Sequence, residues 1–174
     1  TGFQAAACSL VAFSDVDCQF DLMDLSLLLP LAGQYDIVCG YRIGRENCWH
    51  RLFLAWGYNT LIRRLFDLSI RDCDCALKVF RRETLEHLLP TADDVCVNTE
   101  ILWRAKRMGL TMAEVGVQHR PWVFGQSKVS LLDVSRTLRT LIPFWWSHVV
   151  FGKTPLAANV HAAERKEVAR NGVM

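Results

Sequence analysis

Short apolar runs alternate with longer segments of helical periodicity along most of the chain. The run "LVAF" at Leu10–Phe13 and the run "DIVCGY" at residues 36–41 are too short for helices and predict buried strands. The segment "ALKVFRR" at residues 76–82 and the alternating segment "TMAEVGVQ" at residues 111–118 predict two further strands.

The first two predicted helices lie on either side of the second strand. Residues 21–31 are rich in leucine, and this helix is expected to stop near Pro30 and Gly33. Residues 46–66 contain a long helix. One stripe of it is formed by Leu52, Trp56, Asn59 and Arg63.

Three more helices are predicted in the second half of the chain. Residues 82–89 form a short one, and residues 98–109 form one with Asn98 as the N-cap and Gly109 just past its end. Residues 131–150 form a final amphipathic segment. Because strands alternate with helices, the pattern predicts an α/β fold with a mostly parallel sheet flanked by helices.

Composition supports a globular domain with a sizeable core. The chain has 174 residues, of which 51% are hydrophobic and 22% are charged. Twenty basic and 18 acidic residues give a net charge of +2, which argues against a general binder of nucleic acid.

The seven cysteines do not form a disulfide framework. Their number is odd, and Cys73 and Cys75 are one residue apart, which differs from a C-x-x-C zinc half-site. We interpret the cysteines as reduced thiols, mostly in the core, of a protein in a cytosolic compartment.

Two aspartates directly follow the first predicted strand. In open α/β sheets, ligands bind at the carboxyl ends of strands, where Asp15 and Asp17 stand. Two carboxylates there suit Mg²⁺ or Mn²⁺, and the cation would hold a diphosphate. The alternative is a pair of solvated loop aspartates. A second D-x-D at Asp72 and Asp74 shows that the pair alone is a weak signal.

Several stretches, taken in order, resemble family 2 glycosyltransferases with the GT-A (nucleotide-diphospho-sugar transferase) fold. These stretches are "TGFQAAACSLVAFSDVDCQFD", "DIVCGYRIGRENCWHR", "NTLIRRLFDLSIRDCDCALKVFRRETLEHL", "NTEILWRAKRMGLTMAEVGVQHRP" and "GQSKVS". The resemblance covers about residues 2–130. It is strongest to the branch that contains dolichol-phosphate mannose synthase and bacterial polyprenyl-phosphate sugar transferases.

The resemblance implies an inverting, metal-dependent transfer of a sugar from a nucleotide donor to a polyprenyl (dolichyl-type) phosphate. Asp15 and Asp17 would then hold the Mg²⁺ or Mn²⁺ ion and the donor diphosphate, with Gln19 beside them. Glu100 matches an acidic position near the active site of the family; the alternative is an acid favoured by the helix dipole in a first turn.

The resemblance also implies a set of basic residues for the acceptor phosphate, namely Arg42, Arg45, Arg51 and Lys128. For the arginines, the alternative is a solvated helix start. Lys78 matches another basic position, and for both lysines the alternative is a surface location. His119 is more often a turn residue in such a context than a site residue.

Two departures from the family pattern limit these expectations. Trp122 stands where relatives often carry an arginine, and Ala55 stands where dolichol-phosphate mannose synthases tend to carry a small hydroxyl. A mannose-specific assignment is therefore not supported. We also identify no carboxylate as a general base, which favours an ionised phosphate acceptor. The alternatives are a hydroxyl acceptor in cell-envelope glycan synthesis and a non-catalytic scaffold.

The resemblance divides the chain into three parts. Residues 1–130 are expected to be the C-terminal part of a GT-A fold that lacks the N-terminal nucleotide-binding elements. Residues 131–152 are expected to form an amphipathic, membrane-interfacial helix, with Trp145 and Trp146 near basic residues, or else an ordinary capping helix. Residues 153–174 are a polar tail. We expect peripheral attachment at the cytoplasmic face of a membrane.

Overall fold

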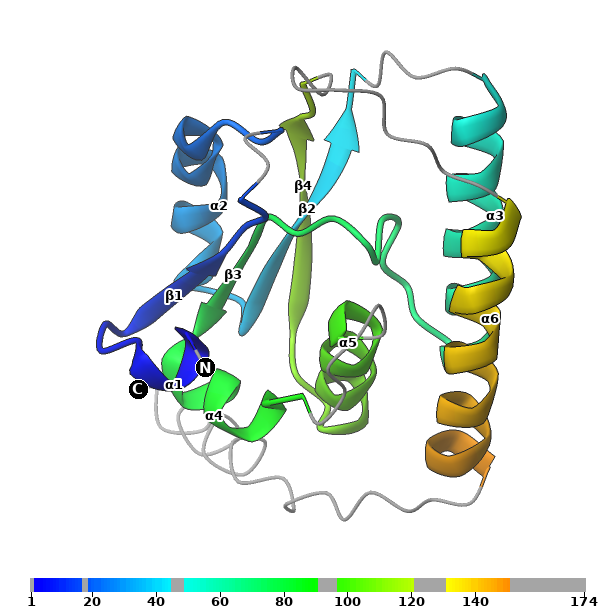
Figure 1. Cartoon of the computed structure of the whole chain (residues 1–174). Helices are drawn as coiled ribbons and strands as arrows, with labels where there is room; N and C mark the ends of the chain where they lie inside the picture. Colours follow the sequence, from blue (N-terminus) through cyan, green and yellow to red (C-terminus); the bar gives the residue numbers. More distant parts are fainter. Residues whose placement is uncertain (1, 17–18, 45–48, 91–96, 121–130, 151–174) are drawn as a thin grey trace, which may run out of the picture.

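A computed structural model describes residues 2–16, 19–44, 49–90, 97–120 and 131–150. In these ranges, four strands form one sheet in the order β1-β3-β2-β4, as Figure 1 shows. Their bounds are Leu10–Phe13 for β1, Ile37–Ile43 for β2, Lys78–Arg81 for β3 and Met112–Gln118 for β4. All four lie where the apolar pattern predicts strands, and the α/β class is confirmed.

The sheet is mixed, which corrects the expectation of a mostly parallel one. Among the described strands, only β2 and β4 pair in parallel, while β3 is antiparallel to both of its neighbours, β1 and β2. Three strands thus share one direction and β3 opposes them. The reason is the loop at residues 67–77, which returns the chain to the carboxyl ends of β1 and β2 before β3 begins (Figure 1).

Helices flank the sheet on both sides (Figure 1). The helical elements are α1 (Gly2–Ala5), the short 3₁₀ helix η1 (Leu22–Asp24), α2 (Leu25–Ala32), α3 (Trp49–Phe66), α4 (Arg82–Leu88), α5 (Val97–Arg107), α6 (Leu131–Trp145) and the π-helical turn η2 (Trp146–Val150). Pro30 lies inside α2, and the helix ends two residues later at Ala32. No helix in the described ranges is both long enough and apolar enough to cross a bilayer.

The two ends of α5 differ in how well the sequence predicted them. Gly109 follows the helix with a φ of 70°, and the backbone N–H of Leu110 bonds to Ala105 O at 3.0 Å, as in a glycine C-cap. The prediction for Asn98 is wrong, because α5 begins at Val97 and Asn98 lies within it. The Asn98 side chain instead accepts a hydrogen bond from Lys78 Nζ at 3.0 Å.

The stripe of α3 that the periodicity marks is buried only in part. Asn59 is buried, but Leu52 and Trp56 are exposed, and the buried face continues through Ile62 and Phe66. The helix packs on the core only along its C-terminal half. The N-terminal half therefore presents large apolar side chains to the surroundings.

The core has two parts, one on each face of the sheet. One includes Ile37, Phe80 and Leu102 between the sheet and helices α3, α5 and α6, and the other includes Leu28 and Val38 under α2. This confirms a sizeable core for a single globular unit.

Helix α6 packs on α3 and α5 through its C-terminal half. Trp145 Nε1 donates to Leu65 O at 2.7 Å, and the ring of Phe144 lies 5.9 Å from Phe66 and 6.2 Å from Trp103. Trp146 remains 53% exposed. Phe144 and Trp145 thus pack on the domain, as expected for an ordinary capping helix, whereas Trp146 lies on the surface.

Three cysteines lie in the core, as expected. Cys39, Cys73 and Cys75 are free and buried, and burial raises the pKa of Cys39 and of Cys73 to about 12. They are therefore neutral thiols near neutral pH, unsuited to nucleophilic chemistry. Cys8 is free and exposed.

Candidate functional site

One edge of the sheet collects the candidate residues. The carboxyl ends of β1, β2 and β4 lie there because these strands share one direction, and the pairing of Phe13 with Lys78 places the start of β3 at the same edge. We name this the carboxyl edge. It receives Asp15 from the segment after β1 and Arg42 from the end of β2.

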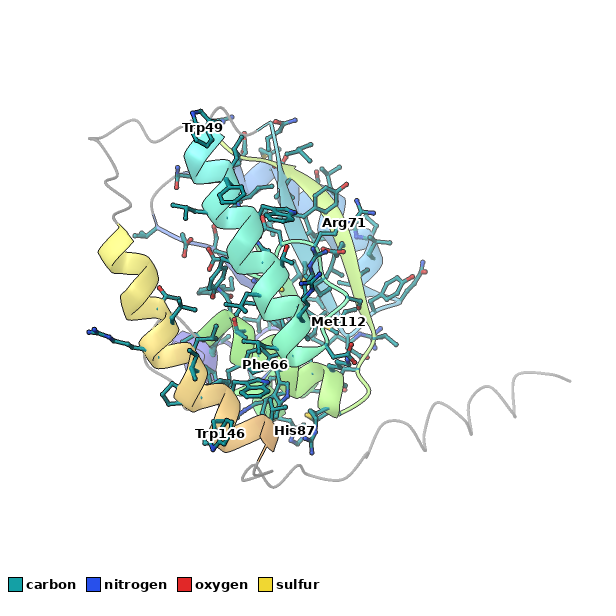
Figure 2. All side chains as sticks on the ribbon, turned by 90° about the vertical axis from the view of Figure 1, so that its right-hand side faces the viewer. Trp49, Phe66, Arg71, His87, Met112 and Trp146 are labelled. Carbon is teal, nitrogen blue, oxygen red and sulfur yellow. The ribbon has the colours of Figure 1, made fainter. Side chains whose placement is uncertain are left out.

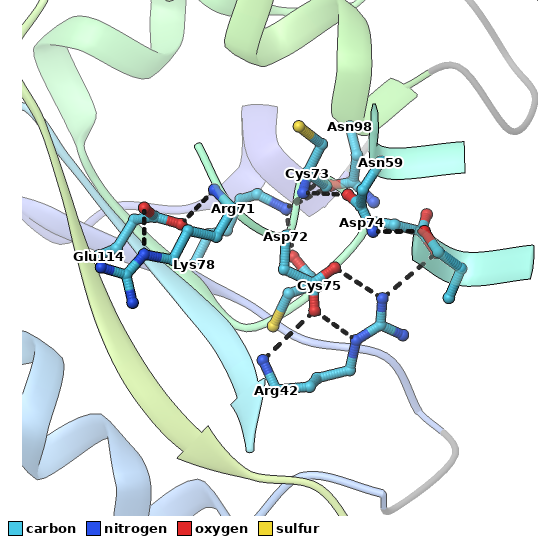
Figure 3. A network of polar contacts seen from close by, with 11 residues as sticks. Arg42, Asn59, Arg71, Asp72, Cys73, Asp74, Cys75, Lys78, Asn98 and Glu114 are labelled. Atoms are coloured by element: carbon cyan, nitrogen blue, oxygen red, sulfur yellow. Dashed lines mark hydrogen bonds and ion pairs between the residues drawn. The ribbon is translucent and has the colours of Figure 1, made fainter. Parts of the chain in front are cut away.

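An arginine–carboxylate pair lies at the centre of this edge. Arg42 donates from Nε to Asp72 Oδ2 and from Nη2 to Asp72 Oδ1, each at 2.7 Å (Figure 3). Asp74 Oδ2 lies 3.7 Å from Arg42 Nη2. The Arg42 and Asp72 side chains are only 16% and 10% exposed. This is a two-point, largely dehydrated ion pair with well-defined geometry.

Electrostatics links three carboxylates at this edge. Burial raises the pKa of the Asp74 carboxyl, the charges of Asp72 and Asp15 add to the rise, and those of Arg42 and Lys78 oppose it. Burial acts to lower the pKa of Arg42, but the hydrogen bond and charge of Asp72 outweigh it and raise that pKa overall. Arg42 is thus a permanent cation among acids.

The loop that carries Asp72 and Asp74 is anchored to the surrounding elements. Cys73 N–H donates to Asn59 Oδ1 of α3 at 2.8 Å, and Arg71 N–H donates to Glu114 Oε1 of β4 at 2.7 Å. The backbone N–H of Gly40 on β2 donates to Leu77 O at 2.8 Å. These contacts hold both carboxylates in place (Figure 3).

Gly40 is required by the close approach of this loop. A Cβ at this position would lie 2.9 Å from Leu77 O and 2.9 Å from Val117 Cγ2. Both distances are too short for an unmoved structure, so a side chain here would push the loop away from β2.

Gln19 joins the segment after β1 to the segment after β4. Its Nε2 donates to Arg120 O at 3.3 Å, and Arg120 N–H donates to Gln19 O at 2.9 Å. Next to it, the rings of Phe20 and His119 meet edge to face with centroids 5.4 Å apart. Gln19 therefore lies at the carboxyl edge, and the contacts of His119 fit a turn residue.

Glu100 is placed inside the protein on α5. It is 0% exposed, and its Oε1 lies 2.5 Å from Arg104 Nη2, one helical turn away. Such a buried i,i+4 pair fits a structural role, and a catalytic role for Glu100 stays a prediction. Lys78 is also fully buried, so the surface alternative for this lysine is wrong.

Several predicted site residues lie outside the described part of the chain. They are Asp17, Arg45 and Lys128, together with Trp122; Arg51 lies in the first turn of α3, but its side chain is not described. Within the described ranges, His, Cys, Asp and Glu side chains form no group of three or more that could hold a metal ion. The carboxylate of Asp15 still offers the oxygen ligand that Mg²⁺ or Mn²⁺ prefers.

Sequence reasoning missed the role of Asp72 and Asp74 at this edge. The pair served only to show that a D-x-D is weak evidence. One signal was present: within residues 72–77 the two acids alternate with cysteine and are followed by alanine and leucine, and these four neighbours are buried. Acids in a buried loop need a cationic partner, and Arg42 is that partner.

The family model described as "Glycosyl transferase family 2" matches residues 1–89. Glycosyltransferase AglD of Haloferax volcanii is 31% identical over 160 residues, which are 85% of this chain and 25% of AglD. An undecaprenyl-phosphate 4-deoxy-4-formamido-L-arabinose transferase of Serratia proteamaculans is 29% identical over 142 residues, which are 81% of this chain and 43% of that protein. The chain thus spans less than half the length of these relatives.

A solved structure shows the same fold. Glucosyl-3-phosphoglycerate synthase of Mycobacterium tuberculosis, in complex with Mn²⁺ and UDP-glucose, matches 84% of this chain and 51% of its own with a TM-score of 0.63 and 19% identity. The expected GT-A fold is confirmed, and the arabinose transferase lies in the expected polyprenyl-phosphate branch. Because the family model covers 89 of the 174 residues, this chain belongs to the family 2 glycosyltransferases.

Proposed function

We propose that the protein transfers a sugar from a nucleotide-diphosphate donor to a polyprenyl phosphate, with inversion and with the help of a divalent cation. The observation that carries this proposal is the carboxyl edge itself. There, the permanent cation Arg42 lies beside Asp72 and Asp74, and Asp15 is close enough to influence the pKa of Asp74.

The acids after β1 are assigned to the donor side. Asp15 and Asp17 would hold Mg²⁺ or Mn²⁺, because carboxylate oxygens suit these hard cations. The cation, when bound, neutralises charge on the departing nucleoside diphosphate. Gln19 keeps this segment attached to the end of β4 through its bond to Arg120 O. The neighbouring M. tuberculosis synthase was solved with Mn²⁺ and UDP-glucose, which supports this assignment.

The basic residues are assigned to the acceptor side. Arg42, together with Arg45, Arg51 and Lys128, would neutralise the acceptor phosphate, for which the guanidinium fork is well suited. Because Asp72 accepts from Nε and Nη2 of Arg42, an arriving phosphate either binds the other N–H groups of that guanidinium or exchanges with Asp72. A phosphate oxygen that attacks opposite the leaving diphosphate inverts the sugar carbon in a single displacement.

A hydroxyl acceptor is the second candidate, and one observation favours it. Such an acceptor needs a general base, and a carboxylate whose pKa is raised toward neutrality serves that purpose better than an ordinary one. Asp74 has a raised pKa and is only part-buried at the carboxyl edge. A phosphate acceptor is already ionised, since its second pKa is about 6, and needs no such base.

The proposed acceptor is a membrane lipid, and α3 offers a surface for a membrane. Trp49, Phe53 and Trp56 are 79%, 62% and 61% exposed and share one side of the helix at i, i+4 and i+7 spacing. Tryptophan is favoured at the headgroup level of bilayers. Figure 2 places Trp49 at the opposite end of this side of the molecule from Trp146. The buried free thiols fit a reducing compartment, and so the cytoplasmic face.

The test of this proposal uses the full-length protein. UDP-, GDP- and dTDP-sugars are supplied with Mn²⁺ and either undecaprenyl phosphate or a polyprenol that lacks the phosphate. Transfer to the phosphate alone supports the proposal. Transfer to the polyprenol or to another hydroxyl acceptor supports the second candidate. No transfer to any acceptor, with no binding of any donor, supports a non-catalytic scaffold and contradicts both.

A further inference from the structure

Lys78 is a fully buried lysine at the start of β3, and none of the assignments above uses it. Its side chain reaches back under the loop before the strand. There, Nζ contacts three oxygen atoms: the backbone carbonyls of Cys73 at 3.4 Å and of Cys75 at closer range, and Asn98 Oδ1 at 3.0 Å (Figure 3).

These contacts match the chemistry of an ammonium group, which has three protons and no acceptor. Cys73 and Cys75 are buried, and carbonyl groups buried away from water need a donor. A charged group is costly to bury, and a neutral donor could also bond to the two carbonyls. Hydrogen bonding to the carbonyls alone therefore does not explain why a lysine is buried here.

The burial of the Lys78 charge is explained further by the turn that this residue holds. Cys75 N–H bonds to Asp72 O at 3.4 Å, which closes a turn over residues 72–75, and this turn carries Asp72 and Asp74. The charge of Lys78 also acts on Asp74, against the combined effect of Asp72 and Asp15. Lys78 thus contributes both a mechanical and an electrostatic restraint at the carboxyl edge.

We propose that Lys78 is a positioning residue: its buried ammonium holds the turn at residues 72–75 and thereby fixes the two carboxylates that face Arg42. The proposal rests on the proposed function for its effect on transfer, but its structural effect is independent of it. Without the ammonium, two carbonyls lose a donor, the turn shifts, and Asp72 no longer meets the Arg42 fork at two points.

The charge count around Asp74 gives the direction of the effect. The groups that act on Asp74 are Arg42 from β2, Lys78 from β3, Asp72 from the same turn and Asp15 from the segment after β1. Two cations thus face three carboxylates. Removal of Lys78 leaves one cation, and the edge then repels the anionic donor and acceptor more strongly.

The direct measurement is the rate at which the Arg42 Nε–H proton exchanges with solvent, followed by NMR in the full-length protein labelled with ¹⁵N-arginine. Its resonance is assigned by its absence in Arg42→Lys. In the wild type we expect slow exchange with solvent, because this proton is bonded to Asp72 Oδ2. In Lys78→Met we expect at least tenfold faster exchange. Where transfer occurs, the KM for undecaprenyl phosphate should rise about tenfold with a smaller change in kcat.

A matched control tests whether the turn is specific. Lys106→Met removes another lysine that binds a carbonyl of the same loop, at Asp67, away from the turn. It should leave the exchange rate of Arg42 Nε–H unchanged. If Lys78→Met folds with unchanged exchange, or if Lys106→Met accelerates it equally, the proposal is wrong.

A milder pair of variants decides the question if Lys78→Met does not fold. Asn98→Ala removes one of the three oxygens around Lys78 and should accelerate exchange partly, whereas Asn98→Asp restores an oxygen there and should keep it slow. Equal exchange in these two variants overturns the proposal. If exchange behaves as expected but the wild type transfers no sugar, the proposed function fails and the positioning role stands.

Discussion

Arg42 and Asp72, 30 residues apart in the chain, meet through two hydrogen bonds of 2.7 Å in a largely dehydrated setting. Loss of one partner leaves the other charge buried and unpaired. We therefore expect Asp72→Ala to lower the free energy of unfolding by about 3 to 5 kcal/mol. Urea denaturation measures this. In the control Glu86→Ala, which breaks the exposed pair with Arg82, a loss below about 1 kcal/mol is expected.

The metal assignment predicts a loss of donor binding. Asp15→Asn and Asp17→Asn should each abolish Mn²⁺-supported binding of the nucleotide sugar in calorimetry, as EDTA should for the wild type, since an amide is a poorer ligand than a carboxylate. Glu83→Gln, an exposed acid on α4, is the control and should bind normally. Unchanged donor affinity in both Asp15→Asn and Asp17→Asn would contradict the assignment.

The acceptor assignment predicts an effect on one substrate only. Arg51→Ala should raise the KM for undecaprenyl phosphate about 10- to 100-fold, because a charge-assisted hydrogen bond contributes about 1.5 to 3 kcal/mol. Hydrolysis of the donor should be nearly unchanged. Arg64→Ala, near the other end of α3 and exposed, should change neither. An equal loss of transfer and hydrolysis in Arg51→Ala would indicate a folding role instead.

The raised pKa of Asp74 predicts how stability depends on pH. The folded state holds the Asp74 proton more tightly than the unfolded state, so ionisation of this group costs stability. The cost begins as pH rises above the ordinary value of 3.8 and is complete above the raised folded pKa. Asp74→Asn should flatten this fall in Tm between pH 4 and neutrality. If Tm depends on pH equally in Asp74→Asn and in the wild type, the pKa of Asp74 is not raised.

The exposed aromatic side of α3 predicts membrane binding. Replacement of Trp49, Phe53 and Trp56 by serine should reduce co-sedimentation with vesicles that contain anionic lipid at least several-fold, while thermal stability changes little because these side chains are exposed. Trp146→Ser tests the expectation for the last helix separately. If vesicle binding responds to Trp146→Ser and not to the α3 variant, the interfacial surface is on α6.

Local pattern was sufficient for most elements and insufficient for the site. The strand Leu10–Phe13 was predicted to the residue, because a four-residue apolar run with polar neighbours has few alternatives. The Arg42–Asp72 pair could not be predicted, because it depends on the return of the loop at residues 67–77 to the end of β2. The same return makes β3 antiparallel.

The burial along the α3 stripe could not be predicted for a related reason. Helical periodicity shows which residues share a side, but not how far along the helix a neighbour covers that side. Asn59 lies against the loop and binds Cys73 N–H, whereas Trp56, one turn earlier, makes no such contact with the described part of the chain and is 61% exposed. The sequence carries the period of a helix, whereas the length of the covered part depends on tertiary packing.

The position of β3 between β1 and β2 has a consequence for synthesis on the ribosome. In the described sheet, β1 and β2 each hydrogen-bond to β3 and are not neighbours of each other. A nascent chain that has emerged only as far as α3 thus carries β1 and β2 without the strand that joins them in this sheet. They gain this shared partner when Lys78–Arg81 leaves the exit tunnel. Until then, the side of each strand that will face β3 stays unpaired, and slower translation across residues 44–77 would prolong that exposure.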